Sequence, residues 1–288
     1  MISDPAYNTV LSSSGHGPFH GRCVLITGAS RGIGKRLALG FAAAGARVGL
    51  LARTQGALNA AQLEIEQAGG QALPIRGDVR EPKEMESAAG RMISSFGGLD
   101  VLIAAAGVQG PVGPFLESRL PQWRDTFDTN LLGVMNCCKA VMPGMIARRS
   151  GKIVALIGNG TSSGRPNFAP YAAAGAAVAR FVESIAGEVH EHNVQINCFH
   201  PGGAYTSMTD EILQAGDRAG AQEVEEAQQT RMTGGIAAER QIQFALFLGS
   251  ERSNHITGKA IHVRDDLKKL EHDNMRPESF TLRRLSKG

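Results

Sequence analysis

The chain has 288 residues, of which 42% are hydrophobic and 20% charged, so it can bury a full core and has the composition of a globular protein. A net charge of +3, scattered basic residues and an aromatic content of only 5% argue against a nucleic-acid-binding surface. No uncharged apolar stretch reaches the length of about 18 residues that a membrane span requires, so we expect no membrane contact.

Residues 1–20 are polar and rich in Ser and Gly, and they predict a flexible N-terminal tail. This tail lacks the basic start and the continuous apolar segment of a signal peptide. The four cysteines, Cys23, Cys137, Cys138 and Cys198, show no Cys-x-x-Cys spacing and no nearby His pair, so we expect reduced thiols and no metal site. These features predict a cytoplasmic protein.

From residue 21 onward, short apolar segments alternate with helical patterns. Runs rich in β-branched residues predict buried strands at 23–28, 47–53, 71–79 and 99–107. Apolar residues at helical spacing predict helices at 32–46, 58–69 and 84–98. The first of these patterns contains Gly45 near its end, and glycine is common just after a helix C-terminus.

The same alternation continues through the second half of the chain. It predicts a long helix over 121–145, a strand at 151–158, a helix at 170–191, a strand at 194–202, a polar helical stretch after about 204, a helix at 239–250 and a strand at 258–264. This order predicts a doubly wound α/β fold, Rossmann-like, with a mostly parallel sheet of about seven strands and helices on both faces. We expect a single domain at 21–263, followed by a charged C-terminal extension at 264–288.

The segment TGASRGIG, from Thr27 to Gly34, lies at the turn between the first predicted strand and the first predicted helix. Glycines at such a turn let the backbone approach a pyrophosphate, and the unpaired N–H groups of the following helix attract the phosphates. A plain glycine turn between strand and helix is the alternative. The position of the motif within a strand–turn–helix unit favours a nucleotide site.

This motif resembles the cofactor loop of the classical short-chain dehydrogenases/reductases, and the resemblance runs from about Gly21 to Val263. Further matches in the same order are the Asp-Val pair after the third strand, the helix asparagine Asn130, and the segment PGGAYT. The resemblance implies a nicotinamide cofactor. It implies that the cofactor contacts Thr27, Gly28, Ser30, Arg31, Gly32, Ile33, Gly34, Arg53, Asp78, Val79, Ala105, Gly107, Pro201, Gly202 and Thr206.

The end of the second predicted strand favours NADP(H) over NAD(H). A carboxylate there would bind a ribose 2′-hydroxyl and repel a 2′-phosphate, but the chain has Ala52 followed by Arg53. Arg31 lies in the glycine loop, and two guanidinium groups suit a phosphate. The alternative is that both are solvated surface arginines.

Members of this family catalyse proton transfer with a Tyr, assisted by a Lys one helical turn later, a Ser before the Tyr, and an Asn. The resemblance assigns the Tyr to Tyr171 and the Asn to Asn130, and it therefore implies that these two are catalytic. The expected Lys is replaced by Gly175 and the expected Ser by Gly158. Because no Lys occurs between Lys152 and Lys259, no shift of the alignment restores one.

Several nearby side chains are candidates to replace the missing groups. Thr161, Ser162 or Asn159 could supply a hydrogen-bond donor if the loop before the Tyr turned inward. Arg165 is a candidate cation, and His200 is a candidate acid or base if it titrates near neutral pH. A polar turn and an ordinary hydrogen-bonded histidine are the alternative interpretations.

Two functions remain open at this level. The first is an NADP(H)-dependent oxidoreductase of a carbonyl or secondary alcohol with an atypical active site, and the second is a non-catalytic nucleotide-binding protein that acts as a sensor or oligomer partner. A non-redox reaction on a bound nucleotide or sugar is a weaker third. The resemblance implies a homodimer or homotetramer that packs through the helices from about 121 and 171, or a hetero-oligomer with an active relative. The substrate is not readable, because Met208 and Ile212 in the expected pocket region are equally typical of core positions.

Overall fold

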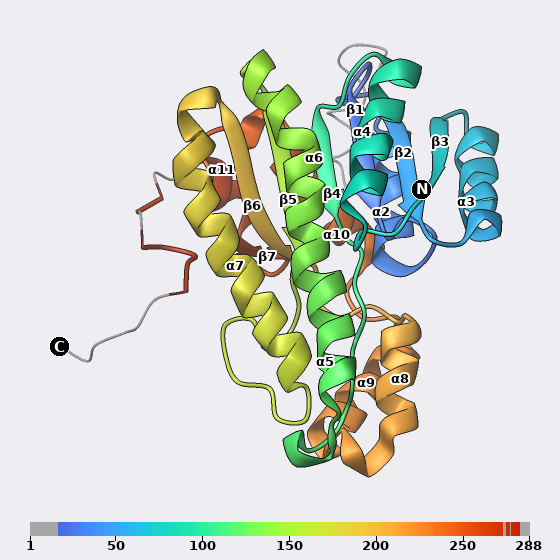
Figure 1. Ribbon diagram of the computed structural model, residues 1–288, viewed down its shortest axis with the longest axis vertical. Helices are drawn as coiled ribbons and strands as arrows, with labels where there is room; N and C mark the ends of the chain where they lie inside the picture. The colour runs from blue at the N-terminus through green and yellow to red at the C-terminus, as the bar shows by residue number, and fades with distance from the viewer. Residues whose placement is uncertain (1–16, 273–274, 277, 283–288) are drawn as a thin grey trace.

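The computed structural model describes residues 17–272, 275–276 and 278–282, so residues 1–16 of the expected tail lie outside this range. Within the described residues, seven strands form one parallel sheet in the order β3-β2-β1-β4-β5-β6-β7 (Figure 1). The predicted doubly wound α/β fold is therefore confirmed. The strands are β1 (Cys23–Thr27), β2 (Arg47–Ala52), β3 (Gln71–Arg76), β4 (Val101–Ala104), β5 (Gly151–Leu156), β6 (Val194–His200) and β7 (Ala260–His262).

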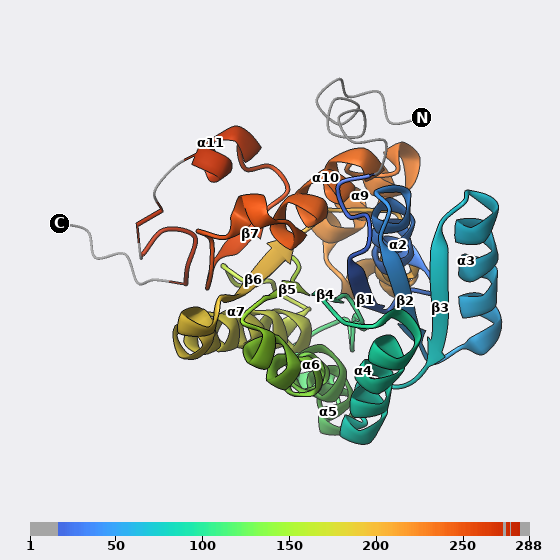
Figure 2. The same cartoon turned by 90° about the horizontal axis from the view of Figure 1, so that it is seen from above.

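Helices cover both faces of the sheet, as Figure 2 shows from above. Two apolar clusters result, one on each side of the strands, because strands of a parallel sheet are buried on both faces. Among the described helices, none combines the length and apolar character that crossing a bilayer requires. The helices are α2 (Gly32–Ala43), α3 (Gln55–Gln67), α4 (Pro82–Phe96), α5 (Leu120–Phe127), α6 (Gly133–Arg148), α7 (Ala169–Val189), α8 (Ser207–Ala215), α9 (Ala221–Thr233), α10 (Ala238–Gly249) and α11 (Leu267–His272).

The long helix predicted over 121–145 is interrupted. A π-helical segment, Asp128–Leu132, separates α5 from α6. The α6 backbone begins against the loop after β3, where a Cβ added at Gly133 would lie 2.6 Å from Cγ2 of Val79. Such π-helical bulges mark functional sites, and this one carries Asn130.

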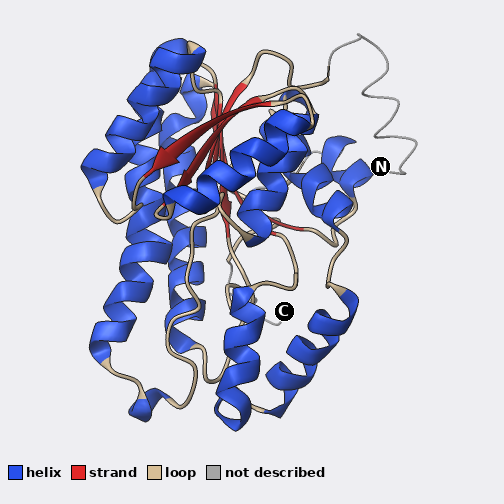
Figure 3. Cartoon of the chain, turned by 90° about the vertical axis from the view of Figure 1, so that its right-hand side faces the viewer, coloured by secondary structure: helices blue, strands red, loops and turns tan. Residues whose placement is uncertain are grey.

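The other boundaries differ from the predicted ones by a few residues at most. β7 covers only Ala260–His262 of the strand expected at 258–264. The polar stretch after 204 forms α8 and α9, which lie with α5 beyond one end of the sheet (Figures 1 and 3). These helices extend the protein on the side where the cleft described below opens.

Thr27, the last residue of β1, joins the two central strands at the point where the strand order reverses. Its buried hydroxyl oxygen accepts hydrogen bonds from the backbone N–H groups of Ala105 and Ala106, both at 3.0 Å. These N–H groups follow β4, where no neighbouring strand continues to pair them. The hydroxyl thereby fixes the floor of the crevice in which doubly wound folds bind ligands.

We expect Thr27→Val to lower the free energy of unfolding by about 2 kcal/mol or more, because it leaves two backbone N–H groups without an acceptor while preserving side-chain shape. Urea denaturation followed by circular dichroism measures this change. Thr27→Ser, which keeps the hydroxyl, is the matched control and should lose clearly less. Equal losses in the two variants would contradict the role of the hydroxyl.

Candidate active site

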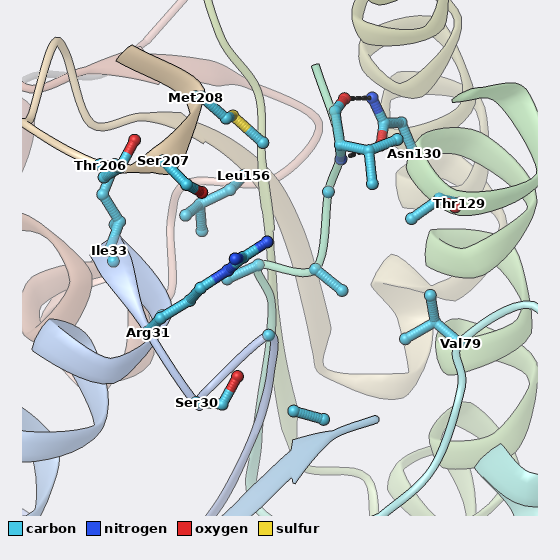
Figure 4. Close-up of a pocket in the computed structure, with 18 of the residues that line it drawn as sticks. Ser30, Arg31, Ile33, Val79, Thr129, Asn130, Leu156, Thr206, Ser207 and Met208 are labelled. Carbon is cyan, nitrogen blue, oxygen red and sulfur yellow. Dashed lines mark hydrogen bonds between the residues drawn. The ribbon is translucent and has the colours of Figure 1, made fainter. Parts of the chain in front are cut away.

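A cleft of about 520 Å³ opens at the carboxyl ends of the central strands. Its volume lies in the range of ligand-binding pockets. Figure 4 shows residues of the glycine loop, β5, the π-helical segment and α8 around it. Of the residues predicted from the sequence, it brings together Gly28, Ser30, Arg31, Gly32, Ile33, Gly34, Arg53, Asp78, Val79, Ala105, Gly107, Asn130, Tyr171, Pro201 and Thr206.

Two predicted residues lie outside this lining. Thr27 is buried beneath the cleft, where its hydroxyl bonds the loop after β4. Gly202 lines a second, smaller cavity next to the first. Sequence reasoning also missed lining residues, among them Thr54, Ala57, Thr129, Ser207, Met208 and Glu211. Met208 was ambiguous because a methionine at helical spacing is as typical of a core as of a pocket.

The glycine loop has the close backbone approaches that its sequence predicts. Gly28 has a φ of +66°, and a Cβ added there would lie 2.9 Å from the carbonyl oxygen of Ala105. A Cβ at Gly34 would lie 2.8 Å from the carbonyl carbon of Gly28. The N-cap position of α2 is Arg31, whose side chain makes no capping hydrogen bond, and the first turn contains no acidic residue. The N–H groups that open α2 therefore remain available to an anion.

Two arginines line the cleft without an ion pair among the described residues. Arg31 extends from the glycine loop across the middle of the cavity, as Figure 4 shows. Arg53 follows directly after β2 and is exposed. The carboxyl group of Glu211 also lines the cleft, where burial raises its pKa and the charge of Arg31 opposes that rise.

Asp78 does not neutralise these arginines. Its carboxylate accepts hydrogen bonds from Nε and Nη2 of Arg80, the latter at 2.6 Å. This pairing lowers the pKa of Asp78, with a further contribution from the nearby charge of Arg53. The carboxylate of Asp78, which follows β3, therefore lines the cleft already paired with Arg80.

Asn130 holds the loop after β4 in place. Its Nδ2 donates to the carbonyl oxygen of Val108, and its Oδ1 accepts from the N–H of the same residue, both at 2.8 Å (dashed lines in Figure 4). Both polar ends of the amide are thus used. The geometry gives Asn130 a positioning role toward the loop that leads to Gln109.

The phenol of Tyr171 occupies the space that a side chain at position 158 would need. A Cβ added at Gly158 would overlap the Tyr171 hydroxyl and lie 2.9 Å from its Cε1. Burial raises the pKa of Tyr171, and the charge of Arg165 opposes this without reversing it. Tyr171 is therefore a neutral phenol at neutral pH, able to donate a proton and poorly able to accept one.

Gly175 is likewise covered by a neighbour. A Cβ added there would lie 2.6 Å from the hydroxyl oxygen of Thr161. The Thr161 side chain is buried, and its hydroxyl donates to the carbonyl oxygen of Gly158 at 2.8 Å. The Thr161 hydroxyl is therefore turned inward, as one sequence interpretation allowed, but it bonds the backbone and lines neither cavity, and Ser162 is exposed. Asn159 does line the second cavity.

Arg165 is near Tyr171, but its charge is engaged. Its guanidinium lies 5.7 Å from the centre of the Tyr171 ring and 3.9 Å from that of Phe168. Its Nε and Nη2 donate to the two carboxylate oxygens of Glu223, both at 2.6 Å. Arg165 therefore stabilises the wall formed with α9 more than it favours a phenolate.

His200 does not meet the condition for a role as acid or base, which was titration near neutral pH, and it fits the alternative of a hydrogen-bonded histidine. Burial, together with the neighbouring His262, lowers its pKa to about 4. The two imidazole ring centres are 4.5 Å apart, and Nδ1 of His200 accepts a hydrogen bond from the N–H of Gly202. His200 is thus neutral under physiological conditions and carries its proton on Nε2.

The fold, and a cleft at the carboxyl ends of its central strands, are typical of dinucleotide-binding α/β proteins, and Tyr171 lines this cleft. Among the described residues, no group of three or more His, Cys, Asp or Glu side chains is placed to hold a metal ion. Residues 22–217 match the family model for short chain dehydrogenases, and the chain belongs to this family of oxidoreductases.

Individual relatives support this membership. The chain is 31% identical over 245 residues to the 3-oxoacyl-[acyl-carrier-protein] reductase FabG of Staphylococcus aureus, covering 84% of this chain and 96% of that one. A short-chain type dehydrogenase/reductase from Mycobacterium ulcerans superimposes with a TM-score of 0.76 at 27% identity, covering 85% and 89% of the two chains. A 7α-hydroxysteroid dehydrogenase complexed with NADH and 7-oxo glycochenodeoxycholic acid superimposes with a TM-score of 0.71 at 28% identity. The match covers 85% of this chain and 93% of that one.

The raised pKa of Tyr171 predicts how stability depends on pH. Since the folded pKa lies above the unfolded value of 10.0, the unfolded chain loses this proton first as the pH rises. The associated stabilisation is present below pH 10 and is lost as the pH rises through the folded pKa. We expect the free energy of unfolding to fall more steeply above pH 10 in the wild type than in Tyr171→Phe. Urea titrations at several alkaline pH values test this, and parallel curves would contradict it.

Proposed function

We propose that the protein is an NADP(H)-dependent oxidoreductase that reduces a small ketone, with Tyr171 as the proton donor in an active site that lacks the usual Lys and Ser. The observation that carries this proposal is the single cleft that a neutral tyrosine, Tyr171, lines together with Arg31 and Arg53, two arginines without an ion pair among the described residues. The secondary alcohol is the substrate in the reverse direction.

The residues of the cleft fit a phosphate-bearing dinucleotide. Gly28 and Gly34 leave room that any Cβ would fill, and the start of α2 offers N–H groups to a pyrophosphate. Arg53 stands where an acidic residue would select NAD(H), and Arg31 adds a second cation. When bound, a reduced nicotinamide supplies the hydride that a carbonyl carbon accepts.

The state of Tyr171 favours reduction over oxidation. A neutral phenol can give its proton to a carbonyl oxygen that becomes a hydroxyl, whereas oxidation of an alcohol requires the phenolate as base. The Lys that would favour phenolate is replaced by Gly175, and the Ser that would bond the substrate oxygen is replaced by Gly158. The S. aureus relative is named a 3-oxoacyl reductase, which agrees with reduction of an oxo group.

The second candidate is a non-catalytic NADP(H)-binding protein. The observation that favours it is the packing of Tyr171 and Thr161 into the spaces next to Gly158 and Gly175, since both catalytic positions are closed to a side chain in this arrangement. Such a protein would bind the cofactor with the same arginines and would not turn it over.

We further propose a homodimer or homotetramer that packs through α5, α6 and α7, or a hetero-oligomer with an active relative, acting in the cytoplasm on a small molecule without nucleic acid or membrane. The proposed functional unit is the single domain at 21–263, flanked by the tail and by the charged extension.

Arg53→Asp tests the choice of cofactor. We expect the affinity for NADPH to fall about tenfold to a hundredfold, because a charge-assisted phosphate contact is lost and a repulsive charge is added. The affinity for NADH should be unchanged or higher. Isothermal titration calorimetry measures both, with Lys83→Asp on α4, which lines neither cavity, as the control of equal charge. An equal loss for both cofactors would overturn the assignment.

Tyr171→Phe tests the reaction itself. We expect NADPH oxidation with a panel of small ketones to fall at least a hundredfold while NADPH affinity is retained, since general acid help is worth about 10²–10⁴-fold. If the wild type oxidises no NADPH with any ketone but binds it, the non-catalytic candidate is correct.

The double variant Gly158→Ser with Gly175→Lys tests whether the two glycines limit the rate. We expect faster turnover by at least tenfold, provided that Tyr171 and Thr161 move to admit the new side chains. Gly90→Lys on α4, where a Cβ meets nothing within 4 Å, is the control for an added lysine. An unchanged rate in the double variant would show that the glycines are not limiting.

A further inference from the structure

A second cavity of about 150 Å³ adjoins the cleft, and Tyr171 lines both. It shares Gly158 and Tyr171 with the cleft, so a molecule seated there contacts the reaction end of the site. Apolar side chains from β5 to α9 form much of its wall, including Ile157, Met208, Ile212 and Ala227. Its volume admits a compact molecule comparable to about five waters.

Gln109 lines this cavity with an amide that the protein does not satisfy. The residue is only 3% exposed, and its Nε2 is buried without a hydrogen-bond partner among the described residues. An unsatisfied buried polar group costs about 1–3 kcal/mol, and native proteins contain few of them. Because the Gln109 amide nitrogen lies at a cavity next to Tyr171, a bound ligand could supply the missing hydrogen-bond partner.

The backbone holds Gln109 in place for such a role. The preceding residue, Val108, is clamped at both its N–H and its carbonyl oxygen by the amide of Asn130. Rotation about the terminal torsion of a glutamine exchanges its nitrogen and oxygen, because that torsion has broad, roughly two-fold preferences. The fixed amide can therefore donate to a carbonyl oxygen or accept from a hydroxyl.

The charges around the cavity point to an uncharged ligand. Arg165 is the one permanently cationic side chain among the described lining residues, and Glu223 already binds it through two hydrogen bonds. Glu226 adds a further carboxylate at the rim. His200 accepts from Gly202 at Nδ1 and is uncharged. A carboxylate or phosphate on the substrate would meet no free cation here.

We propose that Gln109 is a substrate-binding residue whose amide hydrogen bonds a second, uncharged oxygen of a ketone substrate, close to the carbonyl that faces Tyr171. The substrate class is then a small hydroxyketone or diketone without ionised groups. This inference rests on the proposed ketone reduction and adds to it the class of substrate and the residue that selects it.

The direct test compares two probes with the same carbon skeleton, 3-hydroxy-2-butanone and 2-butanone. Binding is measured by the ligand-induced rise in melting temperature without cofactor, so that neither reduction of the ketones nor oxidation of the hydroxyl group occurs. We expect the wild type to bind the hydroxyketone about tenfold more tightly. In Gln109→Met, which is similar in shape and apolar, that preference should disappear while the binding of 2-butanone stays the same.

The melting temperature of Gln109→Met without ligand distinguishes a binding role of Gln109 from a structural one. Because Gln109→Met removes an unpaired buried amide, its melting temperature without ligand should equal or exceed that of the wild type. Gln62→Met on α3, which lines neither cavity, is the control for the substitution. A destabilised Gln109→Met would assign the amide to the fold and overturn the proposal, as would equal wild-type affinities for the two probes.

Turnover with NADPH separates this inference from the proposed function. Wild-type reduction of both ketones without preference, unchanged in Gln109→Met, would overturn the role of Gln109 and leave ketone reduction standing. Binding of 3-hydroxy-2-butanone that depends on Gln109, without any reduction, would support the binding site and overturn the proposed reaction.

Discussion

The cleft depends on one contact between the central strands, the hydrogen bonds that Thr27 accepts from the two backbone N–H groups after β4. Strands β1 and β4 are neighbours in the sheet although two other strands separate them in the sequence. Beyond their ends no ladder continues, and a side-chain hydroxyl takes over the pairing. The backbone of Gly28 then passes so close to the carbonyl group of Ala105, in the loop after β4, that no room remains for a Cβ. A ligand binds between the loops that diverge from this point.

Neighbouring side chains pack closely over Gly158 and Gly175. Without a side chain at 158, the phenol of Tyr171 lies against the backbone of Gly158, and without one at 175, the hydroxyl of Thr161 lies over Gly175. The same Thr161 hydroxyl donates a hydrogen bond to the carbonyl oxygen of Gly158, so one side chain contacts both glycines. Close-packed interiors tolerate lost volume when neighbours fill it. Restoring one side chain alone would therefore displace Tyr171 or Thr161.

The sequence was sufficient for the doubly wound α/β fold, the glycine loop and a group of residues that the structure brings together around the cleft, because these follow from period, motif and position in a βα unit. Features that depend on three-dimensional contact were beyond it. The low pKa of His200 arises from burial and His262, which is distant in sequence. The unpaired amide of Gln109 is visible only once every neighbour is placed. The π-helical segment at 128–132 likewise interrupts a helical pattern that is continuous in the sequence.

The site has two parts that differ in charge and therefore suit different ligand groups. The part of the site that Arg31 and Arg53 line is cationic and suits phosphates, whereas around Tyr171 the cation Arg165 is neutralised by Glu223 and His200 is uncharged. A reaction beside Tyr171 would therefore rely on neutral hydrogen bonds and on position rather than on a nearby charge. Neither Gly158 nor Gly175 supplies a polar side chain beside Tyr171. Under the proposals made above, the phenol of Tyr171 and the buried amide of Gln109 are the neutral groups that engage the substrate, and a second substrate oxygen gives that amide its partner.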